Sequence, residues 1–206
     1  MRASGHDRLV RFLLAALSAA LISSCTLFAP VDNEIRVGVI DKLPLAIPQR
    51  DTRAATLVVL PPSINPVYDT VRMAYRVRPY QVDYFSQYEW GASPREMLLP
   101  LLVQTMESTH YFGAVITPPY FGPYSYALRT EILELTQDFT SDPATLRLSL
   151  RVQITDGASK RIIATRAISL REPMLQNTPY AGVVAANDAT AKALQQVAGF
   201  ALETVQ

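Results

Sequence analysis

Hydrophobic and polar residues alternate most regularly between residues 146 and 154, where every second residue is large and apolar. This period of two is typical of a strand with one face in the core and the other in water. Asp156-Gly157 favours a turn directly afterwards, and residues 161–170 return with strand-forming side chains. The segment therefore predicts a β-hairpin with the inward positions Leu146, Leu148, Leu150, Val152 and Ile154.

Two patterns predict strands in the first half of the chain. Residues 56–60 are continuously apolar, as in a central strand buried on both faces. Two prolines end this run, because proline cannot donate to a strand ladder. Residues 70–75 and 80–85 alternate on either side of Val77-Arg78-Pro79, so they predict a hairpin with its turn at that tripeptide.

Shorter patterns add three features. An aliphatic run at residues 37–40 predicts an edge strand, and residues 113–117 predict a further short strand. Between residues 128 and 139 the apolar positions change phase at Ile132-Leu133, which predicts a β-bulge there.

Two helices complete the pattern. Ser93 and Glu96 have the spacing of a capping box, and Pro94 suits the first helical position, so a helix is predicted to begin at Pro94. After Pro179 the chain is rich in alanine, with apolar residues at helical spacing, which predicts a long C-terminal helix. We therefore expect a single α+β domain, a mixed and mostly antiparallel β-sheet with two main helices packed on it.

The first 24 residues have the composition of a secretory signal peptide. Three arginines precede an apolar run at residues 12–22, which is too short to span a bilayer as a stable helix. The run ends in Leu21-Ile22-Ser23-Ser24-Cys25, which resembles a bacterial lipobox with small residues before the lipid-carrying cysteine. Cys25 is the only cysteine, and a buried structural cysteine is the alternative. We expect lipid attachment at Cys25.

These features divide the chain into three parts. Residues 1–24 are the expected signal peptide, residues 25–55 the lipidated cysteine, a tether and a possible edge strand, and residues 56–206 the globular domain. In the lipoprotein class an aspartate after the cysteine favours the inner membrane, so Thr26 points to the periplasmic face of the outer membrane. A mature chain without a second cysteine forms no internal disulfide, so the core must supply its stability.

Composition and charge exclude several classes of function. The chain has 206 residues, 49% of them hydrophobic and 18% charged, which fits one globular domain. Removing residues 1–24 changes the formal charge from +1 to −1 and leaves no basic stripe, so we expect no nucleic-acid partner. The sequence shows no nucleophile elbow, metal-ligand spacing or phosphate loop, and the lone His110 of the mature chain is expected to be structural. We expect no catalysis, no cofactor and no metal site.

Aromatic residues are the candidates for contact with a partner or with lipid. Tyrosine and tryptophan give a large contact area at a low entropy cost. Two alternatives stay open: Trp90, the only tryptophan, can be a core residue near the helix start, and residues 120–126 can form a packed turn. If Trp90→Ala and Tyr124→Ala leave both folding and partner capture intact, we expect the contact on the wet face of Arg147, Arg151 and Gln153. The candidate residues are Tyr84, Tyr88, Trp90, Tyr120 and Tyr124.

Several segments, in their order after the lipobox, resemble the ABC-type transport auxiliary lipoprotein family, and the likeness spans most of the mature chain. The segments are Thr56-Leu57-Val58-Val59-Leu60-Pro61-Pro62, Arg72-Met73-Ala74-Tyr75, Tyr84-Phe85 through Glu89-Trp90 to Ser93-Pro94, Met97-Leu98, Gln137-Asp138-Phe139 and Ala185-Ala186-Asn187.

The resemblance implies both a fold and a function. It implies a small α+β domain that serves, without enzymatic activity, as the outer-membrane lipoprotein of a lipid transport system. In such a system an ABC ATPase, a permease and an MCE (mammalian cell entry) substrate-binding protein move phospholipids or sterol-like lipids. The direct partner would be the MCE-domain protein and, through it, the permease and ATPase. Because MCE-type proteins form symmetric rings, we also expect a homo-oligomer that gains affinity by multivalency.

Two other classes of function were weighed against this one. A lipid hydrolase would need a G-x-S-x-G elbow with a base, and the sequence has no such elbow. A free-standing, periplasm-facing lipoprotein that binds a small apolar ligand or another envelope assembly is the stronger alternative, because of the aromatic content. Recovery of an MCE-domain protein in a pull-down would separate it from the transport function.

Overall fold

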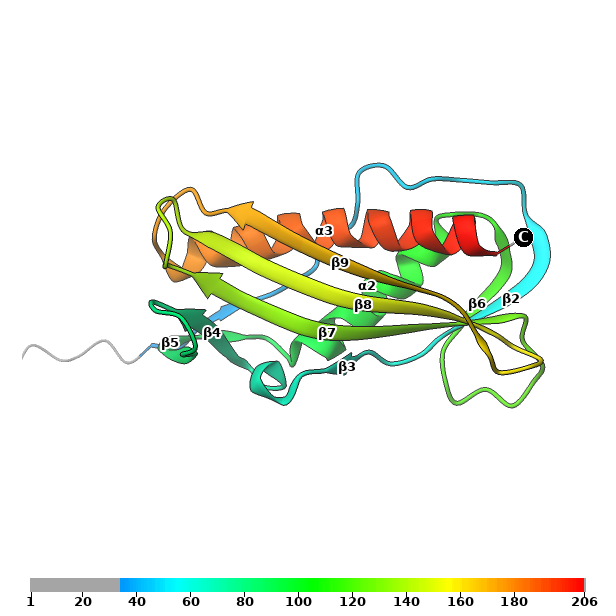
Figure 1. Cartoon of the computed structure of the whole chain (residues 1–206), viewed down its shortest axis with the longest axis horizontal. Coiled ribbons are helices and arrows are strands. Elements are labelled where there is room, and N and C mark those ends of the chain that lie inside the picture. The colour runs from blue at the N-terminus through cyan, green and yellow to red at the C-terminus, as the bar shows by residue number, and fades with distance from the viewer. Residues whose placement is uncertain (1–33, 206) are drawn as a thin grey trace, which may run out of the picture. The chain divides into compact units, whose positions relative to one another are not determined.

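The computed structural model describes residues 34–205, so the expected signal peptide and Cys25 lie outside the described part of the chain. A compact unit begins at Ile35 and holds every element of the described residues (Figure 1). In chain order the elements are β1 (Arg36–Gly38), β2 (Arg53–Val59), β3 (Ser63–Ile64), the 3₁₀ turn η2 (Pro66–Tyr68), β4 (Arg72–Arg76), β5 (Asp83–Trp90), α2 (Pro94–Glu107), β6 (Phe112–Ile116), β7 (Tyr126–Asp138), β8 (Thr145–Asp156), β9 (Ile162–Pro173) and α3 (Pro179–Thr204).

Strand β7 organises the sheet. Along one edge it pairs over its whole length with the antiparallel strand β8, which pairs in turn with β9. Along its other edge it pairs with three parallel strands, β2 at its start, β3 in the middle and β4 at its end. Strands β5 and β1 continue the sheet beyond β4, and β6 lies outside β2. At about 3.3 Å per residue, β7 spans about 40 Å from one end of the domain to the other.

The predicted fold class is confirmed. The domain is α+β, with a nine-stranded mixed sheet that curls into a half-barrel and two helices that lie against one face of it (Figure 1). Five of the eight pairings among the described strands are parallel, yet most of the paired residues belong to the antiparallel meander β7–β8–β9. The predicted edge strand is β1, parallel to β5, and the predicted bulge interrupts the β7–β8 register between Ile132 and Glu134.

The core fills the space between the sheet and the helices. All five inward positions that the alternation predicted on β8 are buried, as are Leu57 to Val59 of β2. Helix α3 contributes alanines and Gly182, which let its backbone approach the sheet closely. A Cβ atom at Gly182 would lie 2.0 Å from the Cδ atom of Gln137, a buried residue of β7. The side-chain amide of Gln137 donates to the Pro179 carbonyl at 3.1 Å, so β7 also fixes the start of α3.

Helix α2 begins at Pro94, as the capping residues predicted. The Glu96 carboxylate accepts a hydrogen bond from the Ser93 backbone N–H at 3.1 Å, and the two residues form a capping box. The Ser93 hydroxyl also donates to the Asp69 carboxylate at 2.9 Å, while the Glu96 N–H donates to the Ser93 carbonyl at 2.9 Å. The cap therefore also ties the helix start to the segment between η2 and β4.

The β4–β5 hairpin is confirmed, but the prediction that its second strand begins at Tyr80 is wrong. Strand β5 begins at Asp83, and Tyr80 lies in the turn with a φ of 64° and a fully exposed side chain. A residue in this left-handed conformation cannot continue the extended backbone of a strand. The connection between the two strands is therefore longer than Val77-Arg78-Pro79.

Candidate interaction surfaces

Within residues 34–205, no group of three or more His, Cys, Asp or Glu side chains is arranged to hold a metal ion. In the same part of the chain, no helix has both the length and the apolar character needed to cross a bilayer.

Two of the predicted contact residues on β5 are half-buried and partly engaged within the domain. The Tyr84 hydroxyl donates to the Val67 carbonyl at 2.8 Å, and the Arg72 guanidinium lies 4.2 Å from the centre of the Tyr84 ring. The Tyr88 hydroxyl accepts a hydrogen bond from Arg36 of β1 at 2.9 Å. These tyrosines therefore help to hold η2 and β1 against β5.

Trp90 was expected among the partner-facing residues, and the structure buries it instead. Its side chain is 5% exposed and belongs to the main hydrophobic core at the end of β5. This placement agrees with the alternative that Trp90 is a core residue near the start of α2. We therefore leave Trp90 out of any proposed contact surface.

The segment 120–126, here called the aromatic loop, is exposed at its tip and packed at its base. Phe121 is 99% exposed and Tyr120 is exposed beside it. At the base, the Lys160 ammonium lies 4.0 Å from the centre of the half-buried Tyr124 ring. The Gly157 N–H also donates to the Ser125 carbonyl at 2.8 Å. The base of the loop is therefore a packed turn, as in the alternative, whereas the tip of the loop is exposed to solvent.

The two aromatic segments lie far apart. Tyr84 of β5 pairs with Ala74, and the neighbouring Tyr75 pairs with Gln137 at the end of β7. The aromatic loop leads into Tyr126 at the start of β7, about 40 Å away along that strand. The distal end of the domain, as we call it, holds residues 118–126 and 156–163 (Figure 1). The proximal end is the one where the described chain begins, and it holds residues 34–42 and 173–184 (Figure 1).

An aromatic cluster that the sequence pattern did not reveal lies on the proximal half of the sheet. The rings of Tyr75 and Phe85 stack with their centroids 4.4 Å apart, and Phe139 packs edge-on against both. These residues come from β4, β5 and the loop after β7, so only the folded topology brings them together. All three are partly shielded, so the cluster contributes packing between the strands.

The wet face of β8, which is the alternative contact surface, carries a network of ion pairs. Arg147 contacts Glu134 at 3.0 Å and Asp138 at 3.4 Å, and Arg76 contacts Asp138 at 2.6 Å. Burial alone would raise the pKa of Asp138, but hydrogen bonds from Arg76 and Thr140 hold that pKa well below its usual range. Further along β8, Arg151 pairs with Glu131 at 2.6 Å and Gln153 donates to Thr165 at 3.3 Å. These side chains bind one another across the strands.

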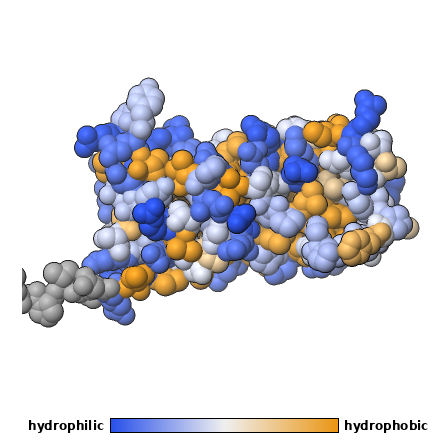
Figure 2. All heavy atoms as spheres, turned by 90° about the horizontal axis from the view of Figure 1, so that it is seen from below, coloured by the Kyte–Doolittle hydropathy of each residue, from blue (hydrophilic) through white to orange (hydrophobic). Residues whose placement is uncertain are grey.

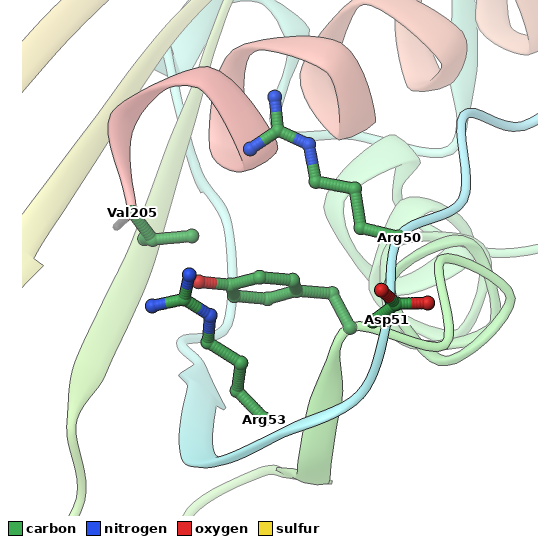
Figure 3. Close-up of a pocket in the computed structure, with 5 residues that line it drawn as sticks. Arg50, Asp51, Arg53 and Val205 are labelled. Carbon is green, nitrogen blue, oxygen red and sulfur yellow. The ribbon is translucent and has the colours of Figure 1, made fainter.

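A cationic hollow of about 570 Å³ lies beside the C-terminal end of α3 (Figure 3). The Arg50 guanidinium donates to the Leu202 carbonyl at 2.5 Å, which satisfies one of the last carbonyls of the helix. The Arg53 guanidinium lies 5.8 Å from the centre of the Tyr111 ring. The sequence pattern did not reveal the hollow, because residues 50–55 were interpreted as a loop before the first central strand, whereas β2 begins at Arg53. Arg50 is engaged by the helix end, which favours a structural role.

The surface seen from below mixes hydrophobic and polar residues, with one hydrophobic group where the described chain begins (Figure 2). Over residues 34–205 the large hydrophobic side chains exposed at the proximal end include Val37, Val39, Leu175, Tyr180 and Val184, whereas Phe121, Ile162 and Ile163 are exposed at the distal end. None of these residues was a named candidate contact, although Phe121 lies within the candidate aromatic segment 120–126.

Comparison with known proteins assigns the chain to a family and supports the fold. The family model for ABC-type transport auxiliary lipoprotein components matches residues 41–198. No curated protein matches the chain. A crystal structure from Xanthomonas campestris, of the family DUF330, has a TM-score of 0.72 at 19% identity and covers 82% of this chain and 95% of its own. A hypothetical protein of Chlamydia trachomatis has a TM-score of 0.52 at 9% identity, over 74% of this chain and 98% of its own.

Proposed function

The chain belongs to the family of ABC-type transport auxiliary lipoprotein components, and from this premise we propose that it is the outer-membrane lipoprotein of an envelope lipid transport system. It acts without catalysis, is anchored through a lipid on Cys25, and docks the periplasmic MCE-domain protein that delivers lipid to or from the ABC permease and ATPase. Family membership supports the auxiliary role in ABC-type transport and the lipid-anchored location in the envelope.

The observation that carries the docking role is the exposed tip of the aromatic loop. Phe121 and Tyr120 project at the distal end, about 40 Å along β7 from the end where the described chain begins. An aromatic side chain that is nearly fully exposed on a loop with a fixed base suits insertion into a pocket of a protein partner. Ile162 and Ile163 at the start of β9 extend the exposed apolar surface beside the β8–β9 turn.

Phe121→Ala tests this role against Leu175→Ala as a matched control. Both side chains are more than nine-tenths exposed, at opposite ends of the domain, so neither change should lower the melting temperature. We expect Phe121→Ala to weaken capture of the purified MCE-domain protein by about 2 kcal/mol, roughly 30-fold in Kd, as for a contact hot spot. Leu175→Ala should bind like the unchanged chain. Equal affinity of all three proteins would reject the distal loop as the docking site.

Self-association is the second part of the proposal. A ring of copies would match the symmetry of a ring-forming partner, and each additional contact would then be effectively intramolecular. The outer edge of β9 supports it, since among the described strands β9 pairs only with β8. Light scattering of the lipidated chain in mild detergent should give a mass of several copies. A monomer at every concentration would remove this part of the proposal.

The alternative function, a free-standing lipoprotein that binds a small apolar ligand, has one observation in its favour. A mostly apolar hollow of about 440 Å³ lies between the β9–α3 connection and the first turns of α3, a volume within the range of small-molecule sites. An apolar molecule that co-purifies with the chain, together with no capture of an MCE-domain protein, would favour this alternative.

A further inference from the structure

Two adjoining hollows at the proximal end share their central residues. One lies between β1 and α3 and is lined by Val37 and Val39, and the other lies under the β9–α3 connection and is lined by Leu175. Tyr180 and Val184 of α3 line both hollows, so the two form one continuous surface. We call Val37, Val39, Leu175, Tyr180 and Val184 the proximal patch.

The proximal patch is apolar and exposed, with three of its residues on β1 and α3 and two, Val39 and Leu175, in the adjoining connections. Leu175 is 92% exposed, Tyr180 67% and Val37 63%. Three carboxylates line the hollows. Asp188 pairs with Lys42 at 2.5 Å and Glu172 with Lys192 at 2.6 Å, whereas Asp41 at the β1 side is exposed to solvent. An apolar surface with mostly paired charges around it is suited to contact another apolar or interfacial surface.

Asn187 fixes the N-terminal segment beside the patch. Its side-chain oxygen accepts hydrogen bonds from the backbone N–H groups of Asp41 at 3.0 Å and Lys42 at 3.1 Å. Its side-chain nitrogen donates to the carbonyls of Val39 at 2.8 Å and Val183 at 3.0 Å. Three of these bonds join residues 39–42 to α3, and the bond to Val183 lies within the helix. The point where the chain approaches the domain therefore has a fixed position relative to Tyr180 and Val184.

The length of chain before the domain limits how far the patch can lie from the anchor. Eight residues lie between Cys25 and Glu34, the first described residue, so nine Cα–Cα steps join the two. Even a fully extended chain covers at most about 3.5 Å per step, or about 30 Å in all. Val37 of the patch follows Glu34 by three residues. A lipid on Cys25 therefore keeps the proximal patch close to the membrane surface, whatever path the intervening chain takes.

We infer that the proximal patch docks onto the lipid surface of the membrane that holds the anchor. Tyr180 contacts the headgroup boundary, where an amphipathic ring is favoured, and the aliphatic side chains reach the acyl boundary. Docking orients β7 away from the membrane and presents the distal end to the periplasm. This inference rests on the lipid anchor of the proposed function.

Site-directed spin labelling of the full, lipidated chain in vesicles of phosphatidylethanolamine and phosphatidylglycerol tests the inference. Cys25 is the only cysteine, and acylation occupies its thiol, so one engineered cysteine takes the only label. Leu175→Cys places the nitroxide on the patch, and Phe121→Cys is the matched control at the distal end, because both positions are exposed. Collisions with a water-soluble nickel complex and with oxygen, which is enriched in lipid, measure the depth of the label.

We expect the label at residue 175 to lose nickel collisions severalfold and to gain oxygen collisions in vesicles, while the label at residue 121 stays fully aqueous. Val37→Glu adds a charge at another exposed position of the patch. Combined with the label at residue 175, it should restore the nickel collisions of that label to the level measured in water. A label at 175 as aqueous as that at 121, on a chain whose acylation is verified by mass spectrometry, would overturn the inference. Shielding that rises with the protein-to-lipid ratio would overturn it in favour of a second copy of the chain. An unacylated Cys25 would reject the anchor and, with it, the inference.

Discussion

The proximal and distal ends expose hydrophobic residues in different structural settings. At the proximal end they lie on β1, on the start of α3 and on the connection before it, where Asn187 and the buried Gln137 fix the backbone. At the distal end the most exposed residue, Phe121, lies at the tip of a loop whose base is held by Thr56, Gly157 and Lys160. A broad surface on rigid elements suits a flat lipid boundary, whereas a protruding aromatic tip suits a pocket in a protein.

The largest expected effect is at the proximal end, for Gly182→Ala. The added Cβ would lie 2.0 Å from the buried amide of Gln137, and that amide would have to give up its hydrogen bond to Pro179. We expect a loss of about 4 kcal/mol in the free energy of unfolding, at the upper end for overpacking. Chemical denaturation measures it.

Gly199→Ala is the matched control on the same helix. Nothing lies within 4 Å of its added Cβ, so the change should stabilise α3 by up to about 1 kcal/mol. If both alanine variants had the same stability, the close approach of α3 to β7 would be wrong.

A smaller effect is expected from Asp138, a buried carboxylate at the proximal end of β7. Because its pKa is lowered in the folded state, it stabilises the fold above about pH 4, its ordinary range, and this contribution is lost as the pH falls further. Asp138→Asn should cost about 3 kcal/mol at pH 7, because it removes a charged acceptor that Arg76 and Arg147 both contact and leaves Glu134 as their remaining shared carboxylate. The free energy of unfolding of this variant should also vary less with pH than that of the unchanged chain between about pH 2 and 5, roughly the range in which carboxylates titrate.

Asp156 provides the distal counterpart. Hydrogen bonds from the backbone and side chain of Ser159 lower its pKa as well, but Asp156 sits in a solvent-accessible turn. Solvent screens the interactions of such a carboxylate. We expect Asp156→Asn to leave the pH profile of unfolding nearly unchanged, and an equal loss of acid sensitivity in both variants would contradict the assignment to Asp138.

At the distal end, Gly157→Ala is expected to affect both stability and docking. Its Cβ would meet the Tyr124 carbonyl oxygen at 1.9 Å, so the backbone at the base of the aromatic loop would have to move. We expect a loss of about 2 kcal/mol in stability together with a weaker capture of the MCE-domain protein, because the aromatic loop loses its fixed base. Unchanged capture would show that the position of the loop is not needed for docking.

The sequence predicted what depends on local pattern. The alternation on β8, the capping residues Ser93 and Glu96, and the phase change at Ile132 each reflect nearby residues, so the hairpin, the start of α2 and the bulge are confirmed. The contacts of Asn187 with residues 39–42 join positions 145 or more apart. The cluster around Phe85 depends on β4, β5 and the loop after β7. No local pattern reveals such partners.

The candidate site was predicted less well for a related reason. Aromatic content selected Tyr84, Tyr88 and Trp90, but residue type does not tell which side of a strand faces the core, and Trp90 is buried. The aromatic loop was selected as a segment, but the candidates named in it were Tyr120 and Tyr124, whereas its most exposed residue is Phe121. The proximal patch combines residues from β1, β9–α3 and α3, and its aliphatic side chains resemble core residues until the topology leaves them uncovered.

Photocrosslinking in cells tests the different roles of the two ends most directly. A benzophenone amino acid replaces Phe121 in one chain and Leu175 in another, and the products are identified by mass spectrometry. The account predicts that position 121 crosslinks to the MCE-domain protein of the transport system, while position 175 yields lipid adducts and no adduct with that protein. Crosslinking of position 175 to the MCE-domain protein, with position 121 unreacted, would contradict it.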